Sequence, residues 1–361
     1  MAQLFLFFVL SSLSTFAFGV DVNFFGQARL SESSINSSKI TYDGVGNQLT
    51  FTGLEQAGIR LTENVDDLTQ AVLQVISSDA SHLRLDLLQI NRNLNKNMRL
   101  RLGLQRMPNW LVSEHIQVAA LYPWIEPPKE LYDRMALRSF NGASFDLTVD
   151  NFYATTFLGD ASQNFEFDFA GYSVKAHDVT GLKLGFDNGA VNFFVSGMSA
   201  RPDVTLKASN VSGKNVSLLA HSFMITDYFL FNSGVSWFFG DNMIYAEYAS
   251  TRSSAREYEH FESAYLTYGR KFLEKFTWLA TYSTDLDVRS TIAPSASATY
   301  SAELNYQLNM NNLLKFSLKH VDFKENRATG PFGATTSGLL NMAASPGGNF
   351  NIISAGWAFI F

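Results

Sequence analysis

The segment 299–308, TYSAELNYQL, alternates between two kinds of side chain with a strict period of two. Successive side chains of a β-strand point to opposite faces, so each kind forms one face of the strand. We therefore expect a strand here with one apolar, aromatic face and one polar face. The apolar set is Tyr300, Ala302, Leu304, Tyr306 and Leu308, and the polar set is Thr299, Ser301, Glu303, Asn305 and Gln307.

The same period recurs along most of the chain, in segments of about ten residues. It is clear in 98–105, 276–285 and 312–320, where Leu, Phe, Trp and Tyr alternate with mainly polar side chains. A soluble β-sandwich also alternates, but it turns its apolar faces inward. Nearly every segment here carries a wide apolar face rimmed by aromatic residues, which favours contact with lipid.

The composition supports a transmembrane antiparallel β-barrel. Hydrophobic residues make up 46% and aromatic residues 14% of the 361 residues, whereas charged residues make up only 17%. The mean hydropathy is nevertheless −0.01, which argues against repeated helical spans of about 20 apolar residues. In a barrel, lipid-facing and lumen-facing residues alternate, so the average cancels.

Charge and cysteine content exclude other classes of protein. The chain has no cysteine, which rules out disulfides and cysteine-ligated metals. Its net charge of −6 gives no basic footprint for nucleic acid.

Residues 1–19 are predicted to be a secretory signal peptide. No charged side chain precedes Asp21, and 4–13 is an apolar run too short to span a bilayer. Ala17 and Gly19 are small residues at the positions that a signal peptidase reads, although no Lys or Arg precedes the run. Cleavage after Gly19 leaves 20–361 as a single barrel domain. The alternative is a first strand or a short buried helix.

The number of strands is expected to be sixteen or eighteen, because an even number is needed if both ends of the barrel lie on the periplasmic side. If the barrel has sixteen strands, two short candidate strands within 178–224 either merge into one strand or lie outside the barrel wall. Tight connections at 150–151, 240–242 and 309–311 contrast with long ones at 33–55, 106–140, 286–296 and 324–349. The candidate strands are 21–32, 56–63, 69–78, 82–91, 97–105, 141–149, 151–159, 164–174, 178–187, 189–198, 213–224, 226–239, 241–251, 258–270, 275–285, 297–308, 312–323 and 350–361.

The C-terminal segment 353–361, ISAGWAFIF, resembles the terminal strand signal of bacterial outer-membrane proteins. Trp357, Phe359 and Phe361 share one face of this strand and end it on a terminal Phe. The resemblance implies that the barrel-assembly machinery reads this strand by adding it to a sheet edge of its own. The 350–361 strand is expected to close the barrel by pairing with 21–32.

Over most of its length the chain resembles the general and anion-type diffusion porins of Gram-negative bacteria. VNFFGQAR at 22–29, AGIRLTEN at 57–64 and RLRLGLQR at 99–106 are placed like the first, second and fifth porin strands. Residues 106–140 then lie where porins fold their third loop into the lumen. The resemblance implies a homotrimer in the bacterial outer membrane, in contact with lipid and lipopolysaccharide. The short connection 78–81 stands where many trimeric porins have a latching second loop.

Four arginines are expected to line the pore, because alternation places them opposite apolar neighbours on their strands. A charge on the lipid face costs about 2–4 kcal/mol at the midplane, so these guanidinium groups should face the lumen. Acids on the infolded loop would oppose them and create a transverse field. The alternative is a structural role, in pairs with neighbours such as Asp86; Lys315 and Lys319 also project inward. The predicted basic wall is Arg60, Arg84, Arg99 and Arg101, and the predicted loop acids are Glu114, Glu126, Glu130 and Asp133.

No catalytic, cofactor-binding or metal site is expected. Only His115 and His260, among six histidines, have a Glu beside them in the sequence, and adjacent strand residues point to opposite faces. The sequence therefore favours a water-filled channel for passive diffusion of ions and small hydrophilic solutes, with no enzymatic activity. The alternative is a non-channel outer-membrane barrel, either a lipid-modifying enzyme or an adhesin or anchor.

Overall fold

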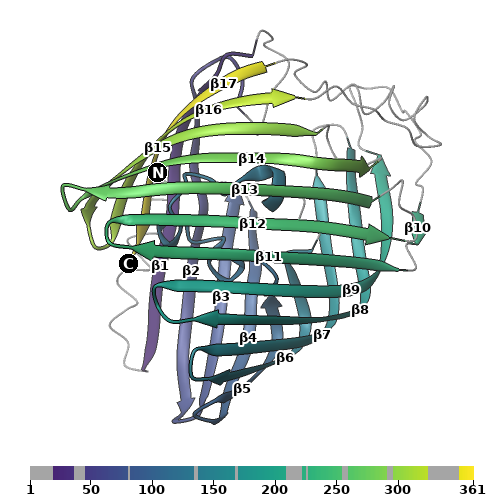
Figure 1. Cartoon of the computed structure of the whole chain (residues 1–361). Coiled ribbons are helices and arrows are strands. Elements are labelled where there is room, and N and C mark those ends of the chain that lie inside the picture. The colour runs from purple at the N-terminus through teal and green to yellow at the C-terminus, as the bar shows by residue number, and fades with distance from the viewer. Residues whose placement is uncertain are drawn as a thin grey trace.

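The computed structural model describes residues 19–35, 45–79, 82–133, 137–166, 170–208, 222–224, 227–253, 259–290, 296–323 and 349–361. The predicted leader lies outside these residues except for Gly19. Antiparallel strands wrap around a common axis and form almost the entire structure (Figure 1). The strands are β1 (Val20–Ser33), β2 (Thr50–Asp66), β3 (Thr69–Asp79), β4 (His82–Asn95), β5 (Met98–Arg106), β6 (Ser139–Val149), β7 (Phe152–Glu166), β8 (Ala170–Asp187), β9 (Val191–Ala208), β10 (Ser222–Met224), β11 (Tyr228–Phe239), β12 (Asn242–Ser253), β13 (Glu259–Phe272), β14 (Phe276–Ser290), β15 (Ser297–Asn309), β16 (Asn312–Phe323) and β17 (Asn349–Ile360).

The first and last strands close the barrel, as predicted. β1 and β17 pair antiparallel from Phe25 opposite Ile360 to Ser33 opposite Ile352. Beyond this ladder, the backbones of Phe24 and Phe361 exchange two N–H···O bonds of 2.7 Å. Every strand of the wall therefore has a partner on both sides, as a bilayer requires.

Sixteen strands form the closed wall, namely β1–β9 and β11–β17. The three-residue β10 pairs with the far end of β9, where Ser222 lies opposite Thr205, and it is an extra strand. The prediction of sixteen strands is thus confirmed, and the alternative of eighteen is wrong. The candidate 213–224 is not a wall strand in its described part, 222–224.

The predicted boundary between 164–174 and 178–187 is wrong. The chain turns instead between β7 and β8, and β8 runs without a break to Asp187. A β-bulge explains the error: His177 pairs with Arg201, whereas the next pair is Thr180 with Ser199. Within the bulge Asp178 has a φ of 51°. The bulge shifts the inward and outward pattern, so the period of two breaks inside one strand.

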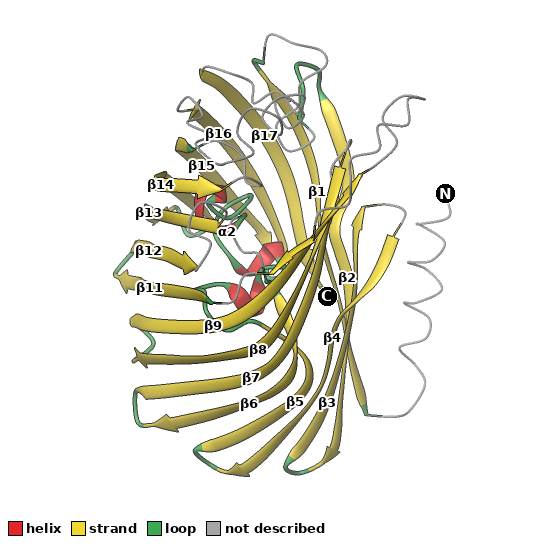
Figure 2. Ribbon diagram, turned by 90° about the vertical axis from the view of Figure 1, so that its right-hand side faces the viewer, coloured by secondary structure: helices red, strands yellow, loops and turns green. Residues whose placement is uncertain are grey.

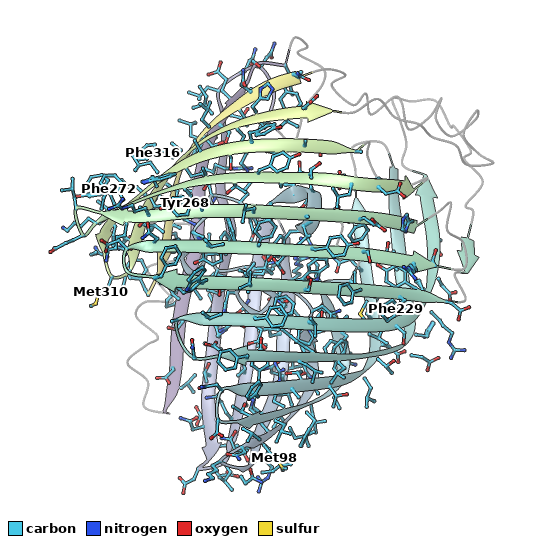
Figure 3. The ribbon with its side chains drawn as sticks, in the orientation of Figure 1. Met98, Phe229, Tyr268, Phe272, Met310 and Phe316 are labelled. Carbon is cyan, nitrogen blue, oxygen red and sulfur yellow. The ribbon has the colours of Figure 1, made fainter. Side chains whose placement is uncertain are left out.

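The two faces of the strands differ as the alternation predicts. On β16 the Phe316 side chain is 47% exposed on the outer surface, while the adjacent Lys315 is 0% exposed. Aromatic side chains such as Phe229, Tyr268 and Phe272 also lie exposed on the outside (Figure 3). The apolar face of the wall therefore points outward, as a lipid-facing barrel requires.

Short turns gather at the end of the barrel where β1 begins and β17 ends. Two-residue turns join β2 to β3 at 67–68, β4 to β5 at 96–97, and β6 to β7 at 150–151. The long connection between β5 and β6 lies at the opposite end. Among the described residues, no helix combines the length and apolar character needed to cross a bilayer.

Candidate pore and its inner loop

The connection between β5 and β6 folds into the barrel. We call residues 107–138 the inner loop; its short helices η1 (Ser113–His115), η2 (Ala119–Leu121) and α2 (Lys129–Tyr132) lie inside the ring of strands (Figure 2). Trp110, Trp124 and Leu131 are almost fully buried there, at 0–2% exposure. The predicted infolded third loop is confirmed, and its aromatic residues provide the apolar contacts.

A lysine on β16 holds the middle of the inner loop. Lys315 Nζ donates hydrogen bonds to the carbonyl oxygens of Ala119 at 2.6 Å, Tyr122 at 2.8 Å and Trp124 at 2.5 Å. Nearby on β15, Glu303 accepts a 2.8 Å bond from the Ile125 N–H. A charged donor and a charged acceptor thus satisfy consecutive backbone groups of the loop, and such bonds are stronger than neutral ones.

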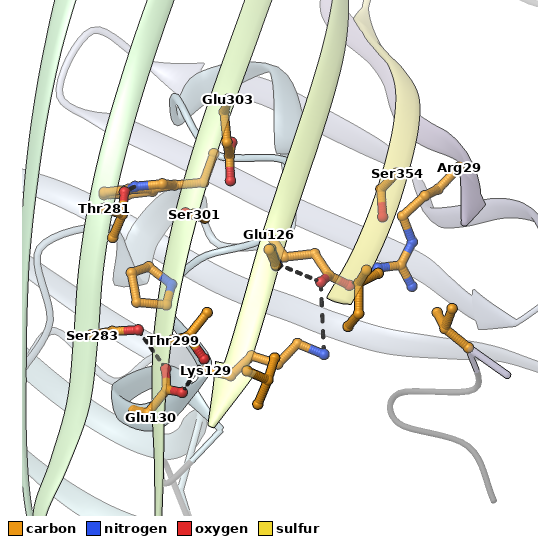
Figure 4. Close-up of a pocket in the computed structure, with 16 residues that line it drawn as sticks. Arg29, Glu126, Lys129, Glu130, Thr281, Ser283, Thr299, Ser301, Glu303 and Ser354 are labelled. Carbon is orange, nitrogen blue, oxygen red and sulfur yellow. Dashed lines mark hydrogen bonds and ion pairs between the residues drawn. The ribbon is translucent and has the colours of Figure 1, made fainter. Parts of the chain in front are cut away.

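Glu126 forms the next anchor, against β1 and β16 (Figure 4). Its carboxylate binds the guanidinium of Arg29 and accepts from Lys319 Nζ at 3.1 Å, with Lys129 Nζ at 3.7 Å. Gln27, which is also on β1, donates a hydrogen bond of 3.1 Å from its amide to the Ile125 carbonyl of the loop. These contacts fix the loop across the seam where the barrel closes.

Glu130 is buried against hydroxyl groups of the wall. Ser283 donates to its carboxylate at 2.6 Å, Ser297 at 3.0 Å and Thr299 at 2.5 Å. The side chain of Glu130 is therefore enclosed between α2 and strands β14 and β15, away from open lumen.

Glu247 on β12 binds the two ends of the loop. It accepts from the Leu111 N–H at 2.7 Å and from the Tyr132 hydroxyl at 2.5 Å, and also from Tyr265 at 2.8 Å. Trp124 packs edge-on against Tyr265, with ring centroids 5.5 Å apart. The inner loop is thus bound along the wall from β12 to β16 and onto β1, and its first residues are also held by Lys183 of β8 and Ser196 of β9.

The basic wall lies on β2, β4 and β5, and the loop reaches this side of the barrel through Glu114 and through Val118, which packs in a cluster with Phe25 and Ile76. Arg99 donates to Asp146 at 2.9 Å with its side chain 46% exposed, and Arg84 on β4 is also exposed. Arg101 contacts Asp146 at 2.8 Å and Glu114 of the loop at 3.0 Å. Because the Glu114 side chain is 52% exposed, solvent reaches the place where loop and wall face each other.

Of the four predicted loop acids, Glu114 alone contacts a member of the basic wall. Asp133 is exposed and lies 3.8 Å from Arg138 at the end of the loop. Glu126 instead attaches the loop to β1 and β16, and Glu130 attaches it to β14 and β15. Asp86, suggested as a partner for the four arginines, is bound by Arg106 and by Gln74.

Partial loss of water and nearby charges act together on Glu114 and His115, which are exposed inside the barrel. Desolvation by the surrounding protein lowers the pKa of His115; Glu114 opposes this, while Arg60 and Lys183 lower it further. Desolvation also works against ionisation of Glu114, but Arg101, His115 and Lys183 outweigh it and hold its pKa below the usual value. At neutral pH the loop therefore presents the carboxylate of Glu114 and the neutral imidazole of His115 to the basic wall.

Several anchoring residues were not identified from the sequence. Alternation alone places Arg29, Glu247 and Glu303 on inward faces, but their loop partners have no periodicity that predicts a contact. Lys315 and Lys319 were expected to point inward, and they do so beneath the loop. In the part of the chain that the structure describes, no three His, Cys, Asp or Glu side chains are grouped to hold a metal ion.

Comparison with known proteins gives matches of structure only. No protein-family model and no curated protein sequence matches the chain. The trimer form of OmpT, an outer-membrane protein of Vibrio cholerae, is 14% identical, with a TM-score of 0.58 over 94% of this chain and 99% of that chain. An anion-selective porin from Comamonas acidovorans is 13% identical, with a TM-score of 0.60 over 95% and 99%.

OmpF of Salmonella typhi, solved in complex with daunomycin, is 8% identical, with a TM-score of 0.61 over 95% of this chain and 97% of that chain. Identities this low establish the fold, and the likeness covers nearly the whole of each chain. The chain has the fold of the bacterial outer-membrane porins.

Proposed function

We propose that this protein is an outer-membrane porin, a water-filled channel through which ions and small hydrophilic solutes diffuse passively. The observation that carries the proposal is the asymmetric position of the inner loop. Lys315 and Glu126 hold it against β16 and β1, and Arg84 on β4 and Arg99 on β5 remain exposed.

The number of strands supports an open lumen. A barrel of sixteen strands is too wide for its wall side chains to fill, so it encloses an aqueous channel unless a segment plugs it. The inner loop narrows this channel where Glu114, whose side chain is 52% exposed, contacts the buried Arg101. The proposal requires no cofactor and no catalytic residue.

The outer surface supports a location in the bacterial outer membrane. Exposed aromatic and aliphatic side chains cover the wall; on the terminal strand Trp357 and Phe361 are exposed, and the ring of Phe359 is covered by its contacts with both. We propose that the barrel-assembly machinery reads this strand and that the outer surface contacts lipid and lipopolysaccharide. By analogy with the trimer form of the Vibrio cholerae protein, we also propose a homotrimer.

Liposome swelling tests the diffusion function. Vesicles containing the folded protein should swell in iso-osmotic solutions of small sugars, at rates that fall as the sugar becomes larger. Protein that has been heat-denatured before reconstitution is the matched control and should give no swelling. If folded protein, identified by its heat-modifiable migration, gives the same rate as empty vesicles, the channel function is wrong.

A further inference from the structure

Four guanidinium groups follow the open side of the barrel from one end to the other. Arg84 is the third residue of β4, at the end with the long connections, and Arg99 is the second residue of β5, at the short-turn end. Arg60 on β2 and Arg101 on β5 lie at intermediate positions. Their outward neighbours, such as Leu102 and Leu85, are exposed on the lipid side, so all four arginines face the lumen.

These four cations have few anionic partners. Arg99 and Arg101 share one carboxylate, that of Asp146, and Arg101 also contacts Glu114. Arg60 donates to the neutral amide of Gln74 at 2.7 Å. Within the described part of the chain, neither Arg60 nor Arg84 has a carboxylate within ion-pair distance.

The other charged groups near these four arginines do not neutralise them. Asp86 is occupied by Arg106, and Asp133 is paired with Arg138, so each pair is neutral as a whole. Lys183 of β8 contributes another positive charge. Its ammonium group donates a hydrogen bond of 3.2 Å to the Trp110 carbonyl of the loop. The section between Arg84 and Arg99 therefore holds five cations outside these neutral pairs, Arg60, Arg84, Arg99, Arg101 and Lys183, and three carboxylates, Glu114, Asp146 and Glu247, of which Glu247 binds the Leu111 N–H beside the Lys183 contact.

The acids that would balance this section are directed elsewhere. Glu126 is bound by Arg29 and Lys319, and Glu130 is enclosed by hydroxyl groups of β14 and β15. The loop thus presents one acid, Glu114, to a wall of arginines. An aqueous lumen whose fixed charge is positive on balance concentrates anions and repels cations.

We propose that the channel prefers anions, and that Arg60 and Arg84 are the residues that determine this preference. A guanidinium group offers planar, paired donors that match carboxylate and phosphate groups, so small oxyanions are the class of solute best suited to these positions. Several such sites in series hold each anion weakly, which allows it to leave as readily as it enters. This inference rests on the proposed channel function.

The test is the reversal potential of the purified protein in a planar bilayer with a KCl gradient. The expected sign is that of chloride permeating better than potassium. The variant Arg60→Gln with Arg84→Gln should lower the chloride-to-potassium permeability ratio several-fold, because the excess positive charge is removed where anions pass. Arg92→Gln is the matched control, since Arg92 lies at the short-turn rim beside Asp66 and outside this section; it should leave the ratio unchanged.

Salt provides a second readout. The preference for chloride over potassium should weaken when the KCl concentration is raised from about 0.1 M to about 1 M, because the Debye length falls from about 10 Å to about 3 Å. A cation-selective wild-type channel, or a ratio that the double substitution leaves unchanged, would overturn the anion preference. An absence of any current would instead contradict the channel function, so the two failures are distinguishable.

Discussion

Lys315 Nζ lies 2.8 Å from the carbonyl oxygen of Tyr122 and thereby joins strand β16 to the middle of a loop 193 positions away in the chain. The ammonium group is fully buried, and two further carbonyls of the same loop accept hydrogen bonds from it. The position of the inner loop, and with it the width of the lumen, therefore depends on a side chain far away in the sequence.

The substitution Lys315→Met should loosen the inner loop. Each lost hydrogen bond to a charged group is worth about 1.5–3 kcal/mol, although water in the lumen replaces part of this. We expect larger fluctuations of the single-channel current and a higher mean conductance than in the wild type. Lys271→Met, at an exposed position next to a short turn, is the control. Identical current traces for Lys315→Met and the wild type would show that Lys315 does not hold the loop.

Glu126→Gln should destabilise the folded barrel. The change removes the carboxylate that neutralises Arg29 and Lys319 beneath the loop, and loss of one member of a buried pair costs about 3–5 kcal/mol. The temperature at which the folded band converts to the unfolded band in electrophoresis should fall. Glu274→Gln, in an exposed turn, serves as the comparison. A transition temperature equal to that of the wild type would argue against this anchor.

Deletion of residues 359–361 should prevent efficient closure of the barrel. It removes both backbone bonds between Phe24 and Phe361 and the pairing of Gly26 with Phe359. We expect little folded, heat-modifiable protein in isolated outer membranes. Phe361→Tyr keeps the backbone and an aromatic ring and should assemble normally. Normal amounts of folded protein after the deletion would show that the last residues do not direct assembly.

Adjacent residues of β4 test the assignment of the two faces. Leu88 is exposed on the outer surface, and Gln89 faces the lumen. Leu88→Arg should destabilise the barrel by up to about 2–4 kcal/mol, depending on its depth in the bilayer, because it places a charge in lipid. Gln89→Arg adds the same side chain on the lumen side and should be tolerated. Urea unfolding in lipid vesicles measures both, and equal stabilities would contradict the assignment.

The sequence predicted the wall better than it predicted the contents of the lumen. Alternation placed Leu102 outside and Arg101 inside because a strand has a fixed period of two. The same rule failed at the bulge between His177 and Thr180, where an extra residue reverses the pattern within one strand. A bulge has no strong sequence signature here, so one strand was divided into two.

The inner loop shows more clearly what the sequence alone does not predict. Its place after the strand that resembles the fifth porin strand indicated that it folds inward, but a loop has no period that orients individual side chains. Glu114 and Glu126 are therefore indistinguishable in the sequence, although one contacts Arg101 on β5 and the other contacts Arg29 on β1. Only the contacts between the loop and distant strands show which acid faces the basic wall and which acid attaches the loop to the barrel.

The current through the purified, folded wild-type protein in a planar lipid bilayer tests the central claim most directly. A water-filled channel predicts discrete, ohmic steps of current whose size rises in proportion to the salt concentration. If the protein inserts as a heat-modifiable barrel and still produces no steps at any salt concentration, the inner loop closes the lumen and the protein is not a diffusion channel.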